Sequence, residues 1–200
     1  LATARIGAIL VCINPAYRLY ELEYALNKVE CKAIVSAEAF KTSQYLEVIQ
    51  KLAPELAEAD PGALHSKKLP HLRSVIRMGD EKTPGMFNFA EVCALANEEL
   101  IRSARSVGER LSADDIINIQ FTSGTTGNPK GASLTHRNIL NNAYFIAQYM
   151  RLTPEDRLCI PVPLYHCFGM VAGVLCCASV GATMVFPGEA FDPVDTLRAV

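Results

Sequence analysis

Apolar runs alternate with amphipathic stretches along the chain, and this alternation predicts strands that alternate with helices. The apolar runs predicted to be strands are 8–13, 33–36, 72–78, 116–121, 131–134 and 183–186. Apolar residues at helical spacing predict helices at 19–29, 45–52 and 135–151, and further helices are expected at 89–105, 169–180 and 193–200. Strands joined by helices pair in parallel through right-handed crossovers. The pattern therefore predicts an α/β fold with largely parallel sheets covered by helices. Between these elements, 54–69 is predicted to be a loop or hairpin excursion.

One apolar stretch, 158–188, contains no acidic or basic residue apart from His166, and as a single helix it would span a membrane. Internal prolines and glycines divide it, however, into a strand, a helix at 169–180 and a second strand. A helix of that length measures about 18 Å, whereas the hydrocarbon core of a bilayer is about 30 Å thick. We therefore expect a buried strand–helix–strand segment and no transmembrane segment.

The composition argues against some classes of binding partner and indicates the redox state of the cellular compartment. Half of the 200 residues are hydrophobic and the net charge is −2, which argues against a dedicated nucleic-acid partner. The seven cysteines form no C-x-x-C pair and no zinc-site spacing, so reduced thiols in an intracellular compartment are expected. The chain begins at Leu1 rather than Met and ends inside a predicted helix, so we expect it to be a piece of a longer protein.

The most informative segment follows the predicted strand at 116–121. Residues 122–131 of this segment contain three glycines, four hydroxyl side chains, one proline and one lysine. Glycine permits positive φ angles, so successive N–H groups can form a nest that binds anions. Hydroxyl groups and a lysine ammonium add donors for phosphate oxygens. The predicted phosphate-binding residues are Thr122, Ser123, Gly124, Thr125, Thr126, Gly127, Asn128, Pro129 and Lys130.

Two simpler interpretations of this segment are a hairpin loop and a Walker A loop. A segment rich in Gly, Ser, Thr and Pro between two strands is usually a hairpin loop, but an ordinary hairpin needs only one or two such residues. A Walker A loop would require Gly where Pro129 stands, and Ser or Thr where Gly131 follows the lysine. A polyphosphate loop of another kind is therefore favoured over both.

Three motifs in this chain resemble those of the adenylate-forming enzymes, which include acyl-CoA synthetases, the adenylation domains of peptide synthetases and luciferases. The segment at 121–131, FTSGTTGNPKG, resembles the signature loop of that family. The segment at 163–169, PLYHCFG, is similar to the family motif that lines the carboxylate-substrate pocket. The weaker third match begins at Arg5 and continues through Asn14-Pro15 to Glu21-Leu22. Within that family, the sequences of these motifs are most similar to those of the medium-chain fatty acyl-CoA synthetases.

The resemblance implies a reaction in two steps. A carboxylic acid, expected to be a medium-chain fatty acid, attacks the α-phosphate of ATP with release of pyrophosphate, and coenzyme A then displaces AMP to give an acyl-CoA thioester. ATP and Mg²⁺ are the implied cofactors, and coenzyme A is the implied co-substrate. A mitochondrial matrix location is implied by the resemblance alone. The alternatives are an amino-acid or aryl-acid adenylating ligase and a non-catalytic nucleotide-binding fragment.

The resemblance also assigns roles to side chains of the two motifs. Lys130 is expected near the outer phosphates, and His166 is expected to orient the carboxylic acid; these two are the predicted catalytic residues. Phe168 is expected to form an apolar wall of the same pocket. Without the resemblance, His166 is equally well explained as a hydrogen-bonded residue at a strand end. Cys167 is expected to be a packing residue, because neighbouring side chains on an extended segment point in opposite directions.

Parts of the family pattern are not in this chain. The family's Tyr-Gly-x-Thr-Glu stretch, its ribose-binding Asp and the lid with its catalytic Lys all follow the signature loop, and none occurs here. We therefore expect the chain to belong to the large N-terminal domain, to lack the C-terminal lid and to be inactive when isolated. The expected parts are a first α/β subdomain at 1–110 and the start of a second, with the phosphate loop, at 111–200.

Overall fold

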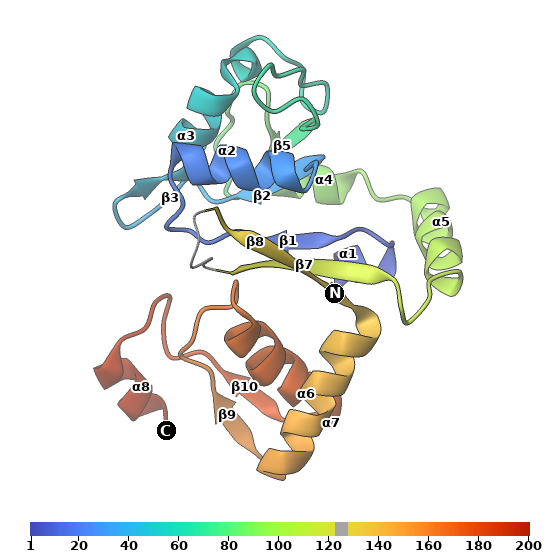
Figure 1. The fold of residues 1–200 in the computed structure, drawn as a ribbon, viewed down its shortest axis with the longest axis vertical. Coiled ribbons are helices and arrows are strands. Elements are labelled where there is room, and N and C mark those ends of the chain that lie inside the picture. Colours follow the sequence, from blue (N-terminus) through green and yellow to red (C-terminus); the bar gives the residue numbers. More distant parts are fainter. Residues whose placement is uncertain (123–127) are drawn as a thin grey trace. The chain divides into compact units, whose positions relative to one another are not determined.

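A computed structural model of the chain describes residues 1–122 and 128–200 (Figure 1). Contacts divide the described residues into two units. The first unit comprises Leu1–Cys12, Arg105–Thr122 and Gly131–Val200, and the second unit comprises Ile13–Ala104 with 128–130. The first twelve residues join the C-terminal part because their strand pairs with one beyond residue 115. The predicted boundary between 1–110 and 111–200 remains a prediction.

The second unit is built on a small parallel sheet. Its strands β2 (Ala33–Ser36), β5 (Ser74–Arg77) and β6 (Phe87–Asn88) lie in the order β2-β5-β6. The helices of this unit are α2 (Leu19–Lys28), α3 (Tyr45–Leu52), a short 3₁₀ helix η1 (Pro54–Ala57) and α4 (Phe89–Ala94), and a two-residue hairpin pairs β3 (Ala39–Phe40) with β4 (Ser43–Gln44). The parallel pairing agrees with the pattern of strands and helices in the sequence.

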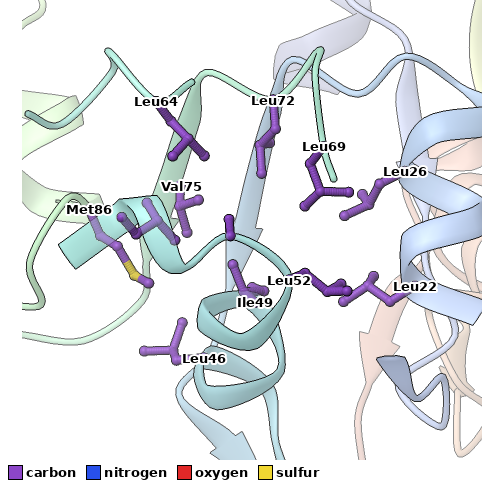
Figure 2. Packing of buried hydrophobic residues seen from close by; sticks show 12 residues of the cluster. Leu22, Leu26, Leu46, Ile49, Leu52, Leu64, Leu69, Leu72, Val75 and Met86 are labelled. Carbon is purple, nitrogen blue, oxygen red and sulfur yellow. The ribbon is translucent and has the colours of Figure 1, made fainter. Parts of the chain in front are cut away.

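Figure 2 shows how the core of the second unit forms from residues at helical spacing. Leu22 and Leu26 of α2 face Ile49 and Leu52 of α3, and Val75 of β5 packs against the same cluster. The predicted loop at 54–69 is not merely a connection, because it contributes further buried leucines at positions 56, 64 and 69. The unit therefore closes a continuous apolar core around α2 and α3.

The first unit contains the sheet to which the predicted phosphate-binding residues 122–130, called the phosphate segment, are attached. Strand β1 (Leu10–Cys12) pairs in parallel with β7 (Ile116–Thr122), and β8 (Lys130–Thr135) is the other neighbour of β7. The remaining elements of this unit are α1 (Ala2–Arg5), α6 (His136–Met150), β9 (Arg157–Cys159), η2 (Phe168–Leu175), α7 (Cys176–Val180), β10 (Thr183–Val185) and α8 (Pro193–Ala199). Thr135 caps α6 as predicted, since its hydroxyl accepts the backbone N–H of Asn138 at 3.2 Å.

The apolar stretch at 158–188 forms a strand, a helical segment and a strand, as predicted. Strands β9 and β10 pair in parallel, and Gly181 ends the helical segment in the left-handed conformation with φ 81°. The prediction of one helix at 169–180 was wrong in detail, because its first part, η2, is a π-helix and only α7 is α-helical. Among the described residues, no helix has the length and apolarity needed to cross a bilayer.

The predicted helix at 89–105 was also wrong, because the structure has two helices in its place. Helix α4 ends at Ala94, and α5 (Glu98–Glu109) begins after Asn97. The Asn97 side-chain oxygen accepts the backbone N–H of Leu100 at 2.9 Å. Asparagine at this position satisfies an otherwise unpaired donor of a new helix start, which favours a break over a continuous helix.

An ion pair joins the segment before β7 to the start of α6 and makes a testable prediction about pH. The Arg137 guanidinium donates to the Asp114 carboxylate at 2.7 and 3.1 Å, and its hydrogen bonds and charge lower the pKa of Asp114. A lowered folded-state pKa adds stability above the unfolded value, about 3.9, and this stability is lost as the pH falls through the folded-state pKa. We expect Asp114→Asn to lower the urea midpoint slightly at pH 7, with the difference from wild type vanishing in strong acid.

The matched control for this ion pair is Glu155→Gln, which removes the same charge at another exposed position. Both members of the Asp114–Arg137 pair are more than half exposed, so solvent screening keeps the expected effect small. A difference between Asp114→Asn and wild type that persisted unchanged in strong acid would contradict an electrostatic origin.

Candidate active site

The phosphate segment is attached to two neighbouring strands of the first sheet. Thr122 is the last residue of β7 and Lys130 is the first residue of β8, and the side chains of both are exposed. The predicted binding residues Ser123, Gly124, Thr125, Thr126 and Gly127 lie outside the described residues, so their roles remain predictions. Because β1 and β7 run in parallel, the segment follows the carboxyl end of a parallel strand, where ligands of α/β sheets usually bind.

Two buried amides fasten β7 just before this segment, and sequence reasoning missed them. The Asn118 Nδ2 donates to the Leu10 carbonyl oxygen at 2.9 Å, and the Gln120 Nε2 donates to the Asn118 Oδ1 at 3.0 Å. Only 2% of Asn118 and 6% of Gln120 are exposed. A signal was present, since two amides at i and i+2 interrupt the same face of an apolar strand. Their hydrogen bonds add a side-chain connection between β7 and β1 beside the backbone ladder.

Within the second unit, the last part of the phosphate segment (128–130) is hydrogen-bonded to helix α2. The Tyr20 hydroxyl, in the first turn of α2, donates to the Asn128 Oδ1 at 3.2 Å. Asn128 is exposed, Pro129 is half-buried, and Lys130 follows. Nothing in the sequence pattern indicated this contact, because the two residues are 108 positions apart.

The second motif forms a tight turn that leads into η2. The His166 Nδ1 accepts the backbone N–H of Phe168 at 3.1 Å. A neutral imidazole that accepts at Nδ1 carries its proton on Nε2, so His166 presents an N–H donor. The side chains of His166 and Phe168 are both exposed, with 62% of Phe168 accessible to solvent. The turn therefore offers a hydrogen-bond donor beside an aromatic surface.

Cys167 lies between those two residues but belongs to the core. Its side chain packs against the cluster formed by Ile139, Ala143 and Val171. Burial raises the pKa of the Cys167 thiol, so the nucleophilic thiolate is disfavoured at neutral pH. The prediction that Cys167 is a packing residue is confirmed, and the adjacent Cys176 and Cys177 are fully buried as expected.

Gly169, the last residue of the same motif, lies very close to the backbone of the loop that precedes η2. A Cβ on Gly169 would lie 2.8 Å from the Pro163 carbonyl carbon and 2.9 Å from the Val162 carbonyl oxygen. Only hydrogen in place of a side chain allows η2 to pack this tightly on the preceding loop. The second glycine of this stretch, Gly173, packs against Ile160 directly after β9, which confirms the expected close packing of small residues.

The described residues therefore give two local arrangements of the predicted site. One is the exit of the phosphate segment, where Asn128 is held by Tyr20. The other is the turn in which His166 and Phe168 are hydrogen-bonded to each other. Outside 123–127, no group of three or more His, Cys, Asp or Glu side chains is placed to hold a metal ion.

The fold and these segments define a class of protein. Parallel sheets carry a donor-rich segment beyond the carboxyl end of β7, which is the arrangement of an α/β protein that binds nucleotide phosphates. More particularly, the sequence profile of the AMP-binding enzymes matches residues 1–200, and the chain belongs to the AMP-binding enzyme family.

Individual relatives support this membership over the whole chain. The chain is 48% identical over 205 residues to the mitochondrial medium-chain acyl-CoA ligase ACSF2 of Bos taurus, covering 100% of this chain and 33% of that protein. It is 44% identical over 199 residues to YngI of Bacillus subtilis, covering 100% of this chain and 36% of that protein. The chain thus spans about a third of the length of these relatives.

A solved structure shows the same fold. The ATP-bound MatB structure from Rhodopseudomonas palustris is 26% identical to this chain and superposes with a TM-score of 0.65. The superposition covers 98% of this chain and 33% of MatB. This likeness confirms the predicted fold class, in which the chain corresponds to part of a larger α/β protein.

Proposed function

We propose that the whole protein converts a medium-chain carboxylic acid into an acyl-CoA thioester by way of an acyl-adenylate. The observation that carries the proposal is the phosphate segment between β7 and β8 in a chain of the AMP-binding enzyme family. In the first step, a carboxylate oxygen bonds to the α-phosphorus of ATP, and pyrophosphate leaves with the electrons of the broken P–O bond. In the second step, the coenzyme A sulfur bonds to the acyl carbon and AMP leaves, while the thiol proton passes to solvent.

The residues of the phosphate segment would stabilise the leaving pyrophosphate. Negative charge grows on this group during the first step, and donors already in place stabilise it without reorganising. Thr122 at one end of the segment supplies a hydroxyl group, Asn128 supplies an amide and Lys130 supplies an ammonium group. The backbone N–H groups of 123–127 are proposed to complete this set. Pro129 has no N–H, so its contribution would be to restrict the backbone before Lys130.

Mg²⁺ is proposed to accompany ATP. This ion prefers oxygen ligands and usually binds through phosphates, with few protein carboxylates. Hydroxyl groups such as that of Thr122 suit its chemistry, and the ion would neutralise part of the triphosphate charge. The donor set of the segment is therefore compatible with a magnesium complex of ATP.

The acid would be positioned by the turn at 163–169. The Nε2–H group of His166 can donate a hydrogen bond to a carboxylate oxygen, and the exposed ring of Phe168 offers an apolar surface to an aliphatic chain. Medium chain length is proposed because the ACSF2 relatives, 44–48% identical to this chain, are named medium-chain acyl-CoA ligases.

The proposed reaction predicts acid-dependent exchange of labelled pyrophosphate into ATP by the whole protein. We expect exchange to be fastest with saturated fatty acids of medium chain length, slower with short acids, and slowest with benzoic acids and amino acids. A thioester assay with coenzyme A tests the second step. Fastest exchange with an aryl acid or an amino acid would contradict the proposed substrate class and assign that acid instead. Binding of ATP without exchange would identify a non-catalytic protein.

A mitochondrial location is proposed on the names of the ACSF2 relatives. The similarly close YngI relative is bacterial, so the resemblance of this chain alone does not determine a compartment. Fractionation of cells of the source organism, with the whole protein detected by antibody, tests the location.

A further inference from the structure

Tyr20 is an exposed residue with an unusual partner for a surface tyrosine. Two-thirds of its surface is accessible to solvent, yet its hydroxyl donates to the Asn128 Oδ1 at 3.2 Å. Asn128 belongs to the last part of the phosphate segment and stands two residues before Lys130. The hydrogen bond therefore connects the second unit's helix α2 to the residue that precedes Pro129 and Lys130.

Helix α2 is a firm point of attachment for this contact. Leu22, Ala25 and Leu26 bury one face of the helix in the core of the second unit. The helix start is closed by the Glu21 carboxylate, which accepts the backbone N–H of Arg18 at 3.1 Å. The first turn, which carries Tyr20, is therefore held by the core and by its own cap.

The exit of the phosphate segment, by contrast, contains a proline. Pro129 cannot donate a backbone hydrogen bond, and it biases the preceding residue, Asn128, toward extended backbone conformations. A side-chain hydrogen bond at Asn128 can supply a restraint that the proline nitrogen cannot. An amide whose oxygen accepts from Tyr20 also directs its two N–H donors away from the phenol.

We propose that Tyr20 is a positioning residue that acts through Asn128 to hold the exit of the phosphate segment in place for ATP. This inference rests on the proposed function, since it concerns the same nucleotide. Tyr20 does not touch the reacting atoms. Its hydroxyl orients the Asn128 amide, and this restraint limits the conformations open to Asn128 and Pro129, which directly precede Lys130. Loss of the hydroxyl leaves these groups present but less well ordered, so binding of ATP suffers more than the chemical step.

The surroundings of Tyr20 suggest a competing explanation, which the control addresses. Its ring lines a hollow of about 350 Å³ along α2, together with Glu23, Tyr24, Asn27 and Lys28. If Tyr20 acted by binding a ligand in that hollow, removal of the Tyr24 hydroxyl would have a comparable effect. Tyr24→Phe is therefore the matched control, because it deletes the same group one turn further along the same helix.

The test is pyrophosphate exchange by the whole protein with the variants Tyr20→Phe, Asn128→Ala, the double variant and Tyr24→Phe. We expect Tyr20→Phe to raise the KM for ATP about two- to tenfold, as for one hydrogen bond. We expect kcat to stay within about twofold and the thermal midpoint to be unchanged, since the residue is exposed. In the Asn128→Ala background, Tyr20→Phe is expected to have no additional effect, because the partner is gone.

Three outcomes distinguish this inference from the proposed function. An active wild type whose KM for ATP is unchanged by Tyr20→Phe overturns the positioning role alone. Equal effects of Tyr20→Phe in the presence and absence of the Asn128 amide also overturn it, because the two residues are then not coupled. A wild type that shows neither exchange nor ATP binding by calorimetry overturns the proposed function and this inference together.

Discussion

Lys130→Ala is expected to lower kcat/KM for ATP in pyrophosphate exchange about a hundred- to a thousandfold. Loss of one fixed donor to developing negative charge has effects of this size in other enzymes. Lys130 is the cation of the phosphate segment and begins β8, so the strand determines where its side chain starts. Its ammonium group suits the outer phosphates, where charge accumulates as pyrophosphate departs. The measurement is the exchange rate of the whole protein as a function of ATP concentration.

Two further variants give this prediction its specificity. Lys130→Arg keeps the positive charge but changes its shape and reach, so we expect a smaller loss than with alanine. Lys32→Ala removes another exposed lysine of the chain and is expected to leave exchange unchanged. The thermal midpoint of each variant separates loss of function from loss of folding. Exchange by Lys130→Ala at the wild-type rate would refute a role for this side chain.

Gly169→Ala is expected to destabilise the whole protein by about 2–3 kcal/mol, near the upper end for overpacked sites. Within a helix, alanine is normally favoured over glycine by about 1 kcal/mol, so propensity alone predicts the opposite sign. Steric overlap determines the result here, because the added methyl group would meet the backbone carbonyls of Val162 and Pro163. Backbone atoms cannot move aside as the end of a flexible side chain can.

Relief of this overlap would also disturb the proposed acid site. The turn at 163–169 holds the hydrogen bond between His166 and the Phe168 N–H, so we expect a higher KM for the acid as well. The matched control is Gly188→Ala, where the added Cβ would be 3.6 Å from the Ala190 carbonyl oxygen, an ordinary contact. Urea unfolding and exchange assays on both variants check the prediction. Equal stability of Gly169→Ala and Gly188→Ala would contradict the steric argument.

The elements that sequence reasoning predicted well are those with a strong local signal. Apolar residues at helical spacing marked α2, α3 and α6, and the apolar run before the phosphate segment marked β7. Where local signals compete, the prediction failed. Asn97 starts a new helix inside a stretch predicted to be a single helix, and the glycine-containing stretch at 168–175 forms a π-helix. Both outcomes depend on hydrogen bonds that periodicity does not encode.

The candidate site was predictable in chemistry but only partly in geometry. The donors of the phosphate segment and the packing role of Cys167 could be inferred from residue types and spacing. The tyrosine that holds Asn128 could not, because Tyr20 belongs to a helix whose apolar spacing accounts only for its buried face. The buried pair Asn118 and Gln120 was visible as an irregularity in a strand, but its partner Leu10 became apparent only in the folded chain.

By itself, the sequence determined the order of strands and helices, the fold class and the donor-rich chemistry of the phosphate segment. These properties follow from side-chain type and from local backbone preferences, which act within a few residues. The tertiary structure alone decided that β1 pairs with β7, that Tyr20 reaches Asn128 and that Gly169 tolerates no side chain. Each of these depends on residues brought together by burial and hydrogen bonding across long stretches of chain, and no local pattern specifies such partners.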